Sequence, residues 1–166
     1  MRAVVQRVTK ASVEVDGRVV NSIGKGLCVL VGISRNDTAQ DVEYIVRKVL
    51  NLRVFDNGDK RWSKSVTECG YEVLCVSQFT LQAVLKGNKP DFHLAMGSEE
   101  SKPFYEEFLA KMRKSYEAEK IKDGAFGAYM QVHIQNDGPV TIELESPASI
   151  KPDKKKDSAR KEETLS

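Results

Sequence analysis

The chain has 166 residues, which is enough for one domain with a sizeable core. It carries 26 basic and 24 acidic residues, and the net charge of +2 lies in the C-terminal segment, because residues 1–146 hold equal numbers of each sign. A neutral body argues against a protein that coats nucleic acid nonspecifically. A neutral body is still compatible with a local basic patch that binds one end of an RNA.

The cysteines and the N-terminus indicate the compartment. Cys28, Cys69 and Cys75 show no paired spacing, so we expect small core residues in a reducing environment. Met1–Val8 alternates in polarity, unlike the apolar block of a signal peptide, and the longest apolar run, Leu27–Ile33, is too short to cross a bilayer. We therefore expect a soluble cytoplasmic protein with no membrane partner, and a nuclear location is the alternative.

Strand patterns dominate the start of the chain. Met1–Val8 and Ala11–Val15 alternate, and Asp16-Gly17 predicts a tight hairpin that returns through Arg18–Ile23. Leu27–Ile33 is apolar at both its odd and its even positions. That pattern is typical of a central strand covered on both faces.

A helix is predicted next. Thr38 is a suitable N-cap, and Asp41 is placed to stabilise the first turn. Apolar residues then recur at helical spacing, at Val42, Ile45, Val46, Val49 and Leu50. Leu52–Phe55 is predicted to be a short strand, and we expect Trp62 beyond it to be a packing anchor rather than a ligand platform.

A buried strand is predicted from Tyr71 to Leu81, and its C-terminal part, Ser77–Thr80, is polar. The polar end of a buried strand is a favoured place for chemistry in α/β proteins, although an ordinary strand end is the simpler interpretation. Gln82–His93 is predicted to be a long polar loop, mobile until it meets a ligand.

The remaining pattern predicts a second helix over about Ser101–Tyr116, with Pro103 in its first turn. Two strands follow, at Tyr129–Gln135 and Val140–Leu144. The chain is thus mostly β, with two helices and six or seven strands in one layered domain over residues 1–146. Residues 147–166 are lysine-rich and nearly free of large apolar side chains, which predicts a disordered basic tail.

The segment Asn136–Thr141 joins the last two predicted strands and reads Asn-Asp-Gly-Pro-Val-Thr. Asn, Asp and Gly tolerate turn dihedrals, and proline fixes φ while removing a backbone donor. A hairpin turn is the simplest interpretation. The alternative is a rigid corner that presents backbone carbonyls to a ligand.

Conventional catalytic motifs are absent from the sequence. The two histidines are far apart, and neither a paired-cysteine motif nor a nucleotide phosphate loop occurs, so we expect no metal and no organic cofactor. A serine-hydrolase triad would have to combine Ser77 or Thr80 with a remote His93 or His133. Hydrolysis of an activated ester, however, needs no strong side-chain base, because orientation and backbone N–H donors can supply most of the acceleration.

Two separated motifs carry a resemblance. Ser77-Gln78-Phe79-Thr80-Leu81, together with Asn136-Asp137-Gly138-Pro139-Val140-Thr141, resembles the signature pair of the D-aminoacyl-tRNA deacylase family. Met1–Val8 and Lys86–His93 are similar to that family too, and the match spans about residues 1–146. The chain resembles the ordinary members found in animals rather than the animal-specific relative, whose corner has a different residue after Gly-Pro.

This resemblance implies an α/β homodimer with a three-layer β/β/α, barrel-like fold, mostly antiparallel sheets and two main helices. The enzyme would hydrolyse the ester between a D-amino acid and the 3′-terminal adenosine of tRNA, and would also clear glycine mischarged onto tRNA. Gly138-Pro139 would be a cis peptide that acts in trans, in the pocket of the partner subunit. Its carbonyls would capture the substrate's α-amino group and exclude an L side chain, with Val140 and Thr141 completing the selectivity motif.

The resemblance also assigns catalytic roles. Ser77, Gln78, Phe79 and Thr80 would line the pocket, and backbone N–H groups near Phe79 and Thr80 would stabilise the oxyanion. Two sources of the nucleophilic chemistry remain open: the RNA's own 2′-OH with main-chain atoms, which we favour, and the hydroxyl of Thr80.

Nucleic-acid contacts are expected on the segment before the second helix. The resemblance implies that Phe92 and His93 hold the adenosine and that Lys86 and Lys89 lie near phosphates, and a solvated loop is the alternative. A second hypothesis is DNA binding, since animal members of the family have been linked to replication origins as DNA-unwinding-element-binding proteins. The tail, residues 147–166, would be the attachment point, but its acidic residues dilute its charge and it offers no base-reading element.

Overall fold

The structure is a computed structural model that describes residues 1–147; the predicted tail lies, apart from Pro147, outside the described residues. The strands are β1 (Arg2–Val15), β2 (Arg18–Ile23), β3 (Gly26–Gly32), β4 (Phe55–Asn57), β5 (Lys60–Lys64), β6 (Glu72–Ser77), β7 (Val84–Lys86), β8 (Lys89–Asp91), β9 (Ile121–Asp123) and β10 (Gln131–Glu145). The helices are α1 (Ala39–Asn51), α2 (Val66–Cys69) and α3 (Ser98–Ser115), with 3₁₀ turns η1 (Phe79–Gln82) and η2 (Ala118–Lys120).

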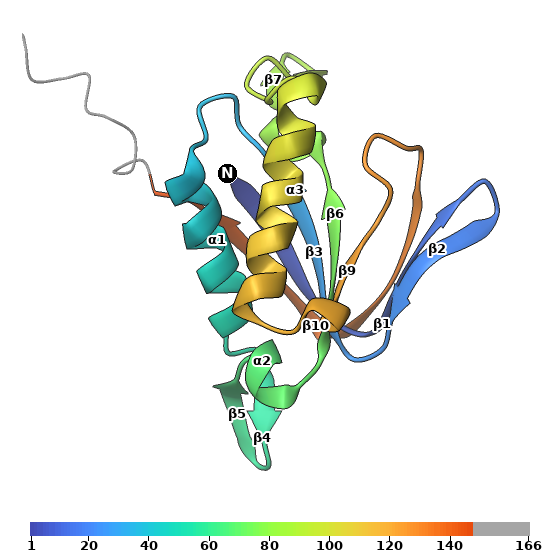
Figure 1. The fold of residues 1–166 in the computed structure, drawn as a ribbon, viewed down its shortest axis with the longest axis vertical. Coiled ribbons are helices and arrows are strands. Elements are labelled where there is room, and N and C mark those ends of the chain that lie inside the picture. Colours follow the sequence, from blue (N-terminus) through green and yellow to red (C-terminus); the bar gives the residue numbers. More distant parts are fainter. Residues whose placement is uncertain (148–166) are drawn as a thin grey trace, which may run out of the picture.

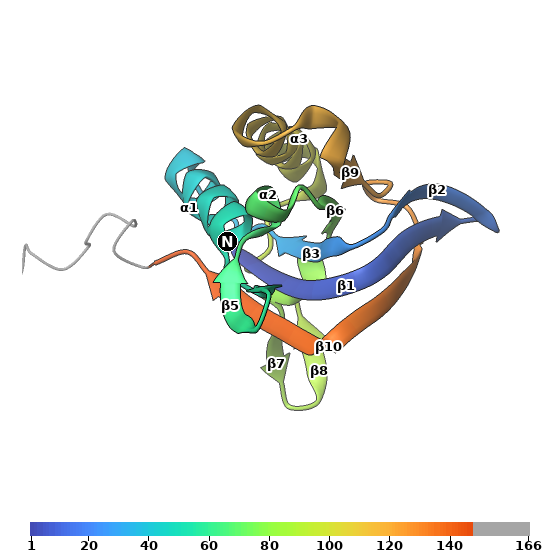
Figure 2. The same ribbon diagram turned by 90° about the horizontal axis from the view of Figure 1, so that it is seen from below.

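Six strands form one curved sheet in the order β10-β1-β3-β6-β9, with β2 paired to β1. The pairs made by β1 are antiparallel, whereas β3–β6 and β6–β9 are parallel. Helices α1 and α3 lie on one face of this sheet, and the long strands β1 and β10 curl away from them (Figures 1 and 2). The predicted fold class, an α/β barrel-like sheet with two main helices, is confirmed. No helix within residues 1–147 is long and apolar enough to cross a membrane.

The central strand β3 has apolar residues on both faces because each face covers a different core. Leu27, Val29 and Val31 belong to the cluster shared with the helices, whereas Cys28 and Leu30 belong to the cluster inside the curled sheet. The predicted apolar face of α1 is buried in the first cluster. The sequence-based interpretation of both elements is therefore confirmed.

Cys28 and Cys75 are core residues, as predicted. Burial raises the pKa of the Cys28 thiol to about 12 and raises the pKa of Cys75 further. Cys69 is half-buried beside the helix cluster. All three thiols are free.

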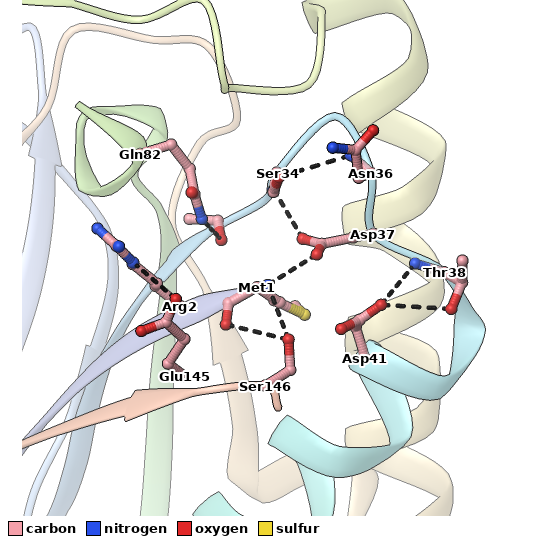
Figure 3. Close-up of polar contacts among 11 residues, drawn as sticks. Met1, Arg2, Ser34, Asn36, Asp37, Thr38, Asp41, Gln82, Glu145 and Ser146 are labelled. Carbon is pink, nitrogen blue, oxygen red and sulfur yellow. Dashed lines mark hydrogen bonds and ion pairs between the residues drawn. The ribbon is translucent and has the colours of Figure 1, made fainter. Parts of the chain in front are cut away.

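A buried polar cluster fastens the start of β1 to the loop before α1 (Figure 3). The Met1 ammonium donates to Asp37 Oδ1 at 2.7 Å and to Ser146 Oγ at 2.9 Å, and the Ser146 N–H donates to the Met1 carbonyl at 2.9 Å. Asp41 Oδ2 accepts the N–H of Thr38 at 2.8 Å, which confirms the predicted start of the helix. The start of β1 and the end of β10, which lie at one end of this strand pair, are thus tied to the loop before α1.

Three predictions before the second main helix need correction. The strand expected at Leu52–Phe55 begins only at Phe55, because it pairs with the unpredicted strand β5. Trp62 is 57% exposed, so the packing-anchor prediction is wrong. Most of the predicted loop Gln82–His93 is the hairpin β7–β8, whose two-residue turn contains Gly87 at a φ of 60°.

The second main helix starts earlier than predicted. Ser98 is its first residue, with Gly97 at the N-cap, and the acidic residues Glu99 and Glu100 occupy the first turn. Negative charge stabilises a helix N-terminus, which favours this earlier start. Pro103 consequently lies in the second turn rather than the first.

The segment Asn136–Thr141 does not reverse the chain. Both of its flanks belong to β10 and pair with β1, with Val8 opposite Asn136 and Gln6 opposite Thr141. Residues 137–140 therefore stand opposite Arg7 alone and project from the ladder as a large bulge. The hairpin interpretation is wrong, because both flanking runs find the same antiparallel partner.

Candidate active site

A pocket of about 610 Å³ lies at the C-terminal end of β6. Its floor includes the buried side chains of Val31 and Val76, and its walls come from the start of α3 and from residues 126–130. This volume is within the range of small-molecule sites, which combine apolar walls with a few polar groups. The pocket therefore suits one end of a larger substrate.

Strand β6 ends at Ser77, and the chain then turns out of the sheet into η1. The N–H of Gln78 donates to the carbonyl of Val31 at 2.7 Å, which fixes the turn against β3. Gly32 permits this close approach, because a Cβ there would lie 2.7 Å from the Cβ of Leu81. The predicted strand is thus too long at its C-terminal end.

The first two N–H groups of η1 have no hydrogen-bond acceptor among residues 1–147. Within η1 the first internal donor is the N–H of Leu81, which bonds to the carbonyl of Gln78, so the N–H groups of Phe79 and Thr80 are left unpaired. Two adjacent unpaired donors beside a pocket are suited to bind an anionic oxygen.

The four predicted catalytic residues are placed differently around the pocket. Ser77, Gln78 and Phe79 line it, whereas Thr80 is exposed and is not among the lining residues. The Thr80 hydroxyl accepts a hydrogen bond from the Gln78 side chain. The predicted functions of these residues stay predictions.

Neither histidine completes a triad in the part of the chain that the structure describes. His93 Nδ1 interacts with Asp91, and His133 Nε2 lies 3.5 Å from Glu14 on the outer strand pair. No hydrogen bond joins either ring to Ser77 or Thr80 within residues 1–147. The geometry therefore favours main-chain chemistry over a serine-hydrolase triad.

Exposed aromatic side chains edge the pocket. Phe79 and Phe92 pack edge to face with ring centroids 5.1 Å apart, and both are at least a third exposed. Tyr129, which also lines the pocket, is 88% exposed. Exposed rings of this kind can stack on nucleic-acid bases.

The hairpin β7–β8 carries cations next to this aromatic edge. Lys86 pairs with Lys89 across the hairpin, and the Lys86 ammonium lies 3.6 Å from Asp91. The hydrogen bond from His93, helped by the charge of Lys86, holds the pKa of Asp91 below its usual value. Lys89 is exposed and has no carboxylate partner in the described part of the chain.

Asn136–Thr141, which contains the bulge of residues 137–140, forms a rigid corner in β10. The Gly138–Pro139 peptide bond is cis, and both residues are exposed. Asn136 spans the corner, because its side-chain oxygen accepts the N–H of Val140 at 2.9 Å and its NH₂ group donates to Thr141 Oγ1 at 2.9 Å. Val140 is buried and anchors the corner in the helix-side core.

Arg7 braces the corner from the neighbouring strand. Its Nε donates to the Asp137 carbonyl at 3.1 Å, and its guanidinium also donates to the Val54 carbonyl at 2.7 Å. A Cβ at Gly138 would lie 2.9 Å from the same guanidinium. Arg7 and Asn136 hold the corner but were not predicted as site residues. Asn136 opens the motif, whereas one sequence gives no signal for the contact of Arg7.

The corner is not among the residues that line the pocket of its own chain. Ser77 of β6 pairs with Val31 of β3, and Val31 pairs in turn with Ala3 of β1. The corner lies opposite Arg7, four residues further along β1. Three strand spacings of about 4.8 Å and four residue rises of about 3.3 Å place the two motifs on the order of 20 Å apart. One chain therefore keeps its two signature motifs separate.

Comparison with known proteins gives a consistent result. A family model described as D-Tyr-tRNA(Tyr) deacylase matches residues 4–145. D-aminoacyl-tRNA deacylase 1 of Homo sapiens is 68% identical over 149 residues, covering 89% of this chain and 71% of the relative. D-aminoacyl-tRNA deacylase of Drosophila melanogaster is 60% identical over 157 residues, covering 95% and 99%.

Solved structures agree with these relatives. The structure of the c-Myc DNA Unwinding Element Binding Protein is 68% identical, has a TM-score of 0.87, and is matched over 89% of this chain and 100% of its own. The resemblance predicted from the two motifs is confirmed, including the similarity to animal members. The chain belongs to the D-Tyr-tRNA(Tyr) deacylase family, a family of hydrolases.

Proposed function

We propose that this enzyme hydrolyses the ester bond between a D-amino acid and the 3′-terminal adenosine of tRNA, and that it also removes glycine mischarged onto tRNA. The observation that carries the proposal is the pair of unpaired N–H groups of Phe79 and Thr80 beside the pocket. It is supported by relatives at 60–68% identity whose names specify D-aminoacyl-tRNA deacylation.

The chemistry follows from these donors. Water attacks the ester carbonyl with the help of the RNA 2′-OH, and the carbonyl oxygen becomes an oxyanion that the two N–H groups stabilise. The bond to the adenosine 3′-oxygen then breaks, that oxygen takes up a proton, and the free amino acid and tRNA leave. The Thr80 hydroxyl is not required, which fits its hydrogen bond to Gln78 and its position outside the lining.

Chiral selection is assigned to the corner of a second copy of the chain. The Gly138 and Pro139 carbonyls would bind the substrate's α-amino group inside the pocket of the partner subunit and leave no room for an L side chain. In support, the corner is exposed, is braced by Arg7 and Asn136, and lies far from its own pocket. The proposed active unit is therefore a homodimer.

The 3′ adenosine is assigned to the aromatic edge of the pocket, with Phe92 and His93 around the base. Lys86 and Lys89 would contact neighbouring phosphates as the cations of β7–β8. DNA binding is a second hypothesis, favoured by the name of the solved relative. The predicted attachment point, residues 147–166, lies outside the described residues apart from Pro147.

The test uses one tRNA charged with the D or the L form of the same amino acid. We expect rapid loss of the D-amino acid and survival of the L-aminoacyl ester, measured by release of radiolabelled amino acid. Equal rates on both esters would contradict chiral selection. Hydrolysis of neither ester would contradict the deacylase function.

A further inference from the structure

The hairpin β4–β5 displays the only tryptophan of the sequence. Its pairs, Phe55 with Lys64 and Asn57 with Lys60, leave residues 61–63 opposite a single residue, so β5 contains a bulge. Trp62 lies in this bulge with a φ of 55° and is 57% exposed. A positive φ is rare for a bulky residue, and an exposed indole adds nothing to a core. The packing of this chain therefore does not explain Trp62.

Four basic residues lie on or next to the hairpin that carries this indole, together with the exposed acidic residues Asp56 and Asp59. Arg53, Lys60 and Arg61 are exposed and Lys64 is half-buried. None of these four has a carboxylate within 4.0 Å among residues 1–147. An exposed aromatic ring among free cations matches nucleic acid, since bases stack on the ring and phosphates neutralise the cations. Tryptophan and arginine are also enriched at protein interfaces, and a protein partner would leave tRNA affinity unchanged in the hairpin variants described below.

The position of the hairpin links it to the corner. The Arg7 guanidinium bonds to the Asp137 carbonyl and to the Val54 carbonyl, and Val54 directly precedes β4. In Figure 2 the β4–β5 hairpin lies beside β10, and in Figure 1 it occupies the end of the molecule opposite β7. The hairpin is thus remote from the pocket of its own chain but adjacent to the corner. A corner that enters the pocket of a second copy, as proposed above, would bring its hairpin close to that pocket.

We propose that the β4–β5 hairpin binds the RNA strand of the aminoacyl-tRNA substrate beyond its 3′ adenosine, with Trp62 stacked on a base and Lys60 and Arg61 at phosphates. The RNA leads away from the pocket at the place where the neighbouring subunit presents this hairpin. The inference rests on the proposed function for the identity of the RNA and for the corner that acts in trans. It adds a second binding region that determines affinity for the whole tRNA but takes no part in ester cleavage.

The experiment compares Trp62→Ala, Trp62→Phe and a Lys60→Ala/Arg61→Ala double variant with the wild type. Lys10→Ala/Arg18→Ala is the matched control, because it removes one exposed lysine and one exposed arginine from the β1–β2 hairpin. Binding of uncharged tRNA is measured by fluorescence anisotropy over a series of KCl concentrations. Values of kcat/KM are measured on D-aminoacyl-tRNA and on D-aminoacyl-adenosine.

We expect Trp62→Ala to weaken tRNA binding about tenfold and to lower kcat/KM on the charged tRNA by a similar factor, while Trp62→Phe recovers most of the loss. Values on D-aminoacyl-adenosine should not change for any hairpin variant. Lys60→Ala/Arg61→Ala should reduce the slope of log Kd against log salt by roughly 1.4 to 1.8, since two phosphate contacts are lost. The control variant should match the wild type in every measurement.

Two results would overturn the inference: unchanged tRNA affinity, or equal losses of kcat/KM on the two substrates. Failure of the proposed function looks different. In that case the wild type hydrolyses neither substrate, while the uncharged-tRNA measurement still shows whether the hairpin binds RNA.

Discussion

The pocket at the end of β6 and the corner in β10 are built by opposite means. The pocket is open, with exposed aromatic edges and two unpaired N–H donors. The corner is not among the residues that line the pocket, but Arg7 and Asn136 hold it by hydrogen bonds of 2.9–3.1 Å. An adaptable binding surface and a rigid excluding surface have different requirements, and this chain places them on different strands. A homodimer is the simplest arrangement that joins one to the other.

Removal of an N–H donor is the most severe test of the pocket. Phe79→Pro deletes the donor, and Gln78 (φ −145°, ψ 84°) lies outside the α region that a following proline disfavours. Phe79→Ala is the matched control, because it removes the ring and keeps the N–H. We expect Phe79→Pro to be slower than Phe79→Ala by about 10²–10³ in kcat on D-aminoacyl-tRNA. Equal rates for the two variants would remove the main-chain donor from the mechanism.

The corner is tested by Gly138→Ala. Gly138 has a φ of 124°, and a methyl group there would lie 2.9 Å from the Arg7 guanidinium, so the corner must shift. We expect kcat/KM on the D ester to fall by about 10², the effect of misplacing a positioning group by about 1 Å. Tm should be measured in parallel to verify that the variant is folded.

Mixing Gly138→Ala with Phe79→Pro tests whether the corner of one chain acts in the pocket of another. Each homodimer is defective, but a mixed dimer contains one intact pocket facing one intact corner. After subunit exchange at equal concentrations, we expect about a quarter of the sites to be active, by random association of two chains. Activity no higher than the mean of the two variants would place both motifs in one chain and contradict action in trans.

The brace is tested by Arg7→Ala, with Arg18→Ala as a control for the loss of an exposed arginine elsewhere. We expect the D/L rate ratio to fall about tenfold, since one charge-assisted hydrogen bond contributes ~1.5 kcal/mol. The rate on the L ester should rise, because a loosened corner excludes the L side chain less well. A D/L ratio equal to that of Arg18→Ala would show that the corner is rigid without Arg7.

Thr80→Val is expected to have the smallest effect. It replaces the hydroxyl by a methyl group of similar shape and keeps the backbone N–H. We expect kcat on the D ester to stay within about twofold of the wild type, because the proposed chemistry uses only the main chain of this residue. A loss comparable to that of Phe79→Pro in a folded protein would return the nucleophile to the Thr80 side chain.

Local patterns predicted much of this fold. The two-sided apolar run of β3, the capped amphipathic α1 and the Asp16-Gly17 hairpin each depend on neighbouring residues, so sequence periodicity identifies them. The continuity of β10 was missed because it depends on pairing with β1, more than 100 positions earlier. The outward bulge at Trp62 was missed for a similar reason, since the partner strand β4 determines it.

The residues of the candidate site were likewise predictable only where local sequence patterns identify them. Ser77, Gln78 and Phe79 are recognisable as the polar end of a buried strand, and the structure places all three at the pocket. Arg7 was not recognisable, because its contact with Asp137 spans 130 positions. Sequence reasoning therefore found the pocket and the corner, but not the residues that hold the corner in place.

The corner has a further consequence for solubility. β10 is an edge strand of 15 residues, and an edge of that length with an unbroken row of backbone groups is a template for sheet extension by other chains. The four bulged residues and the missing N–H of Pro139 divide this edge into two shorter segments. The feature assigned to chiral selection thereby also lowers the tendency of the sheet to grow into aggregates.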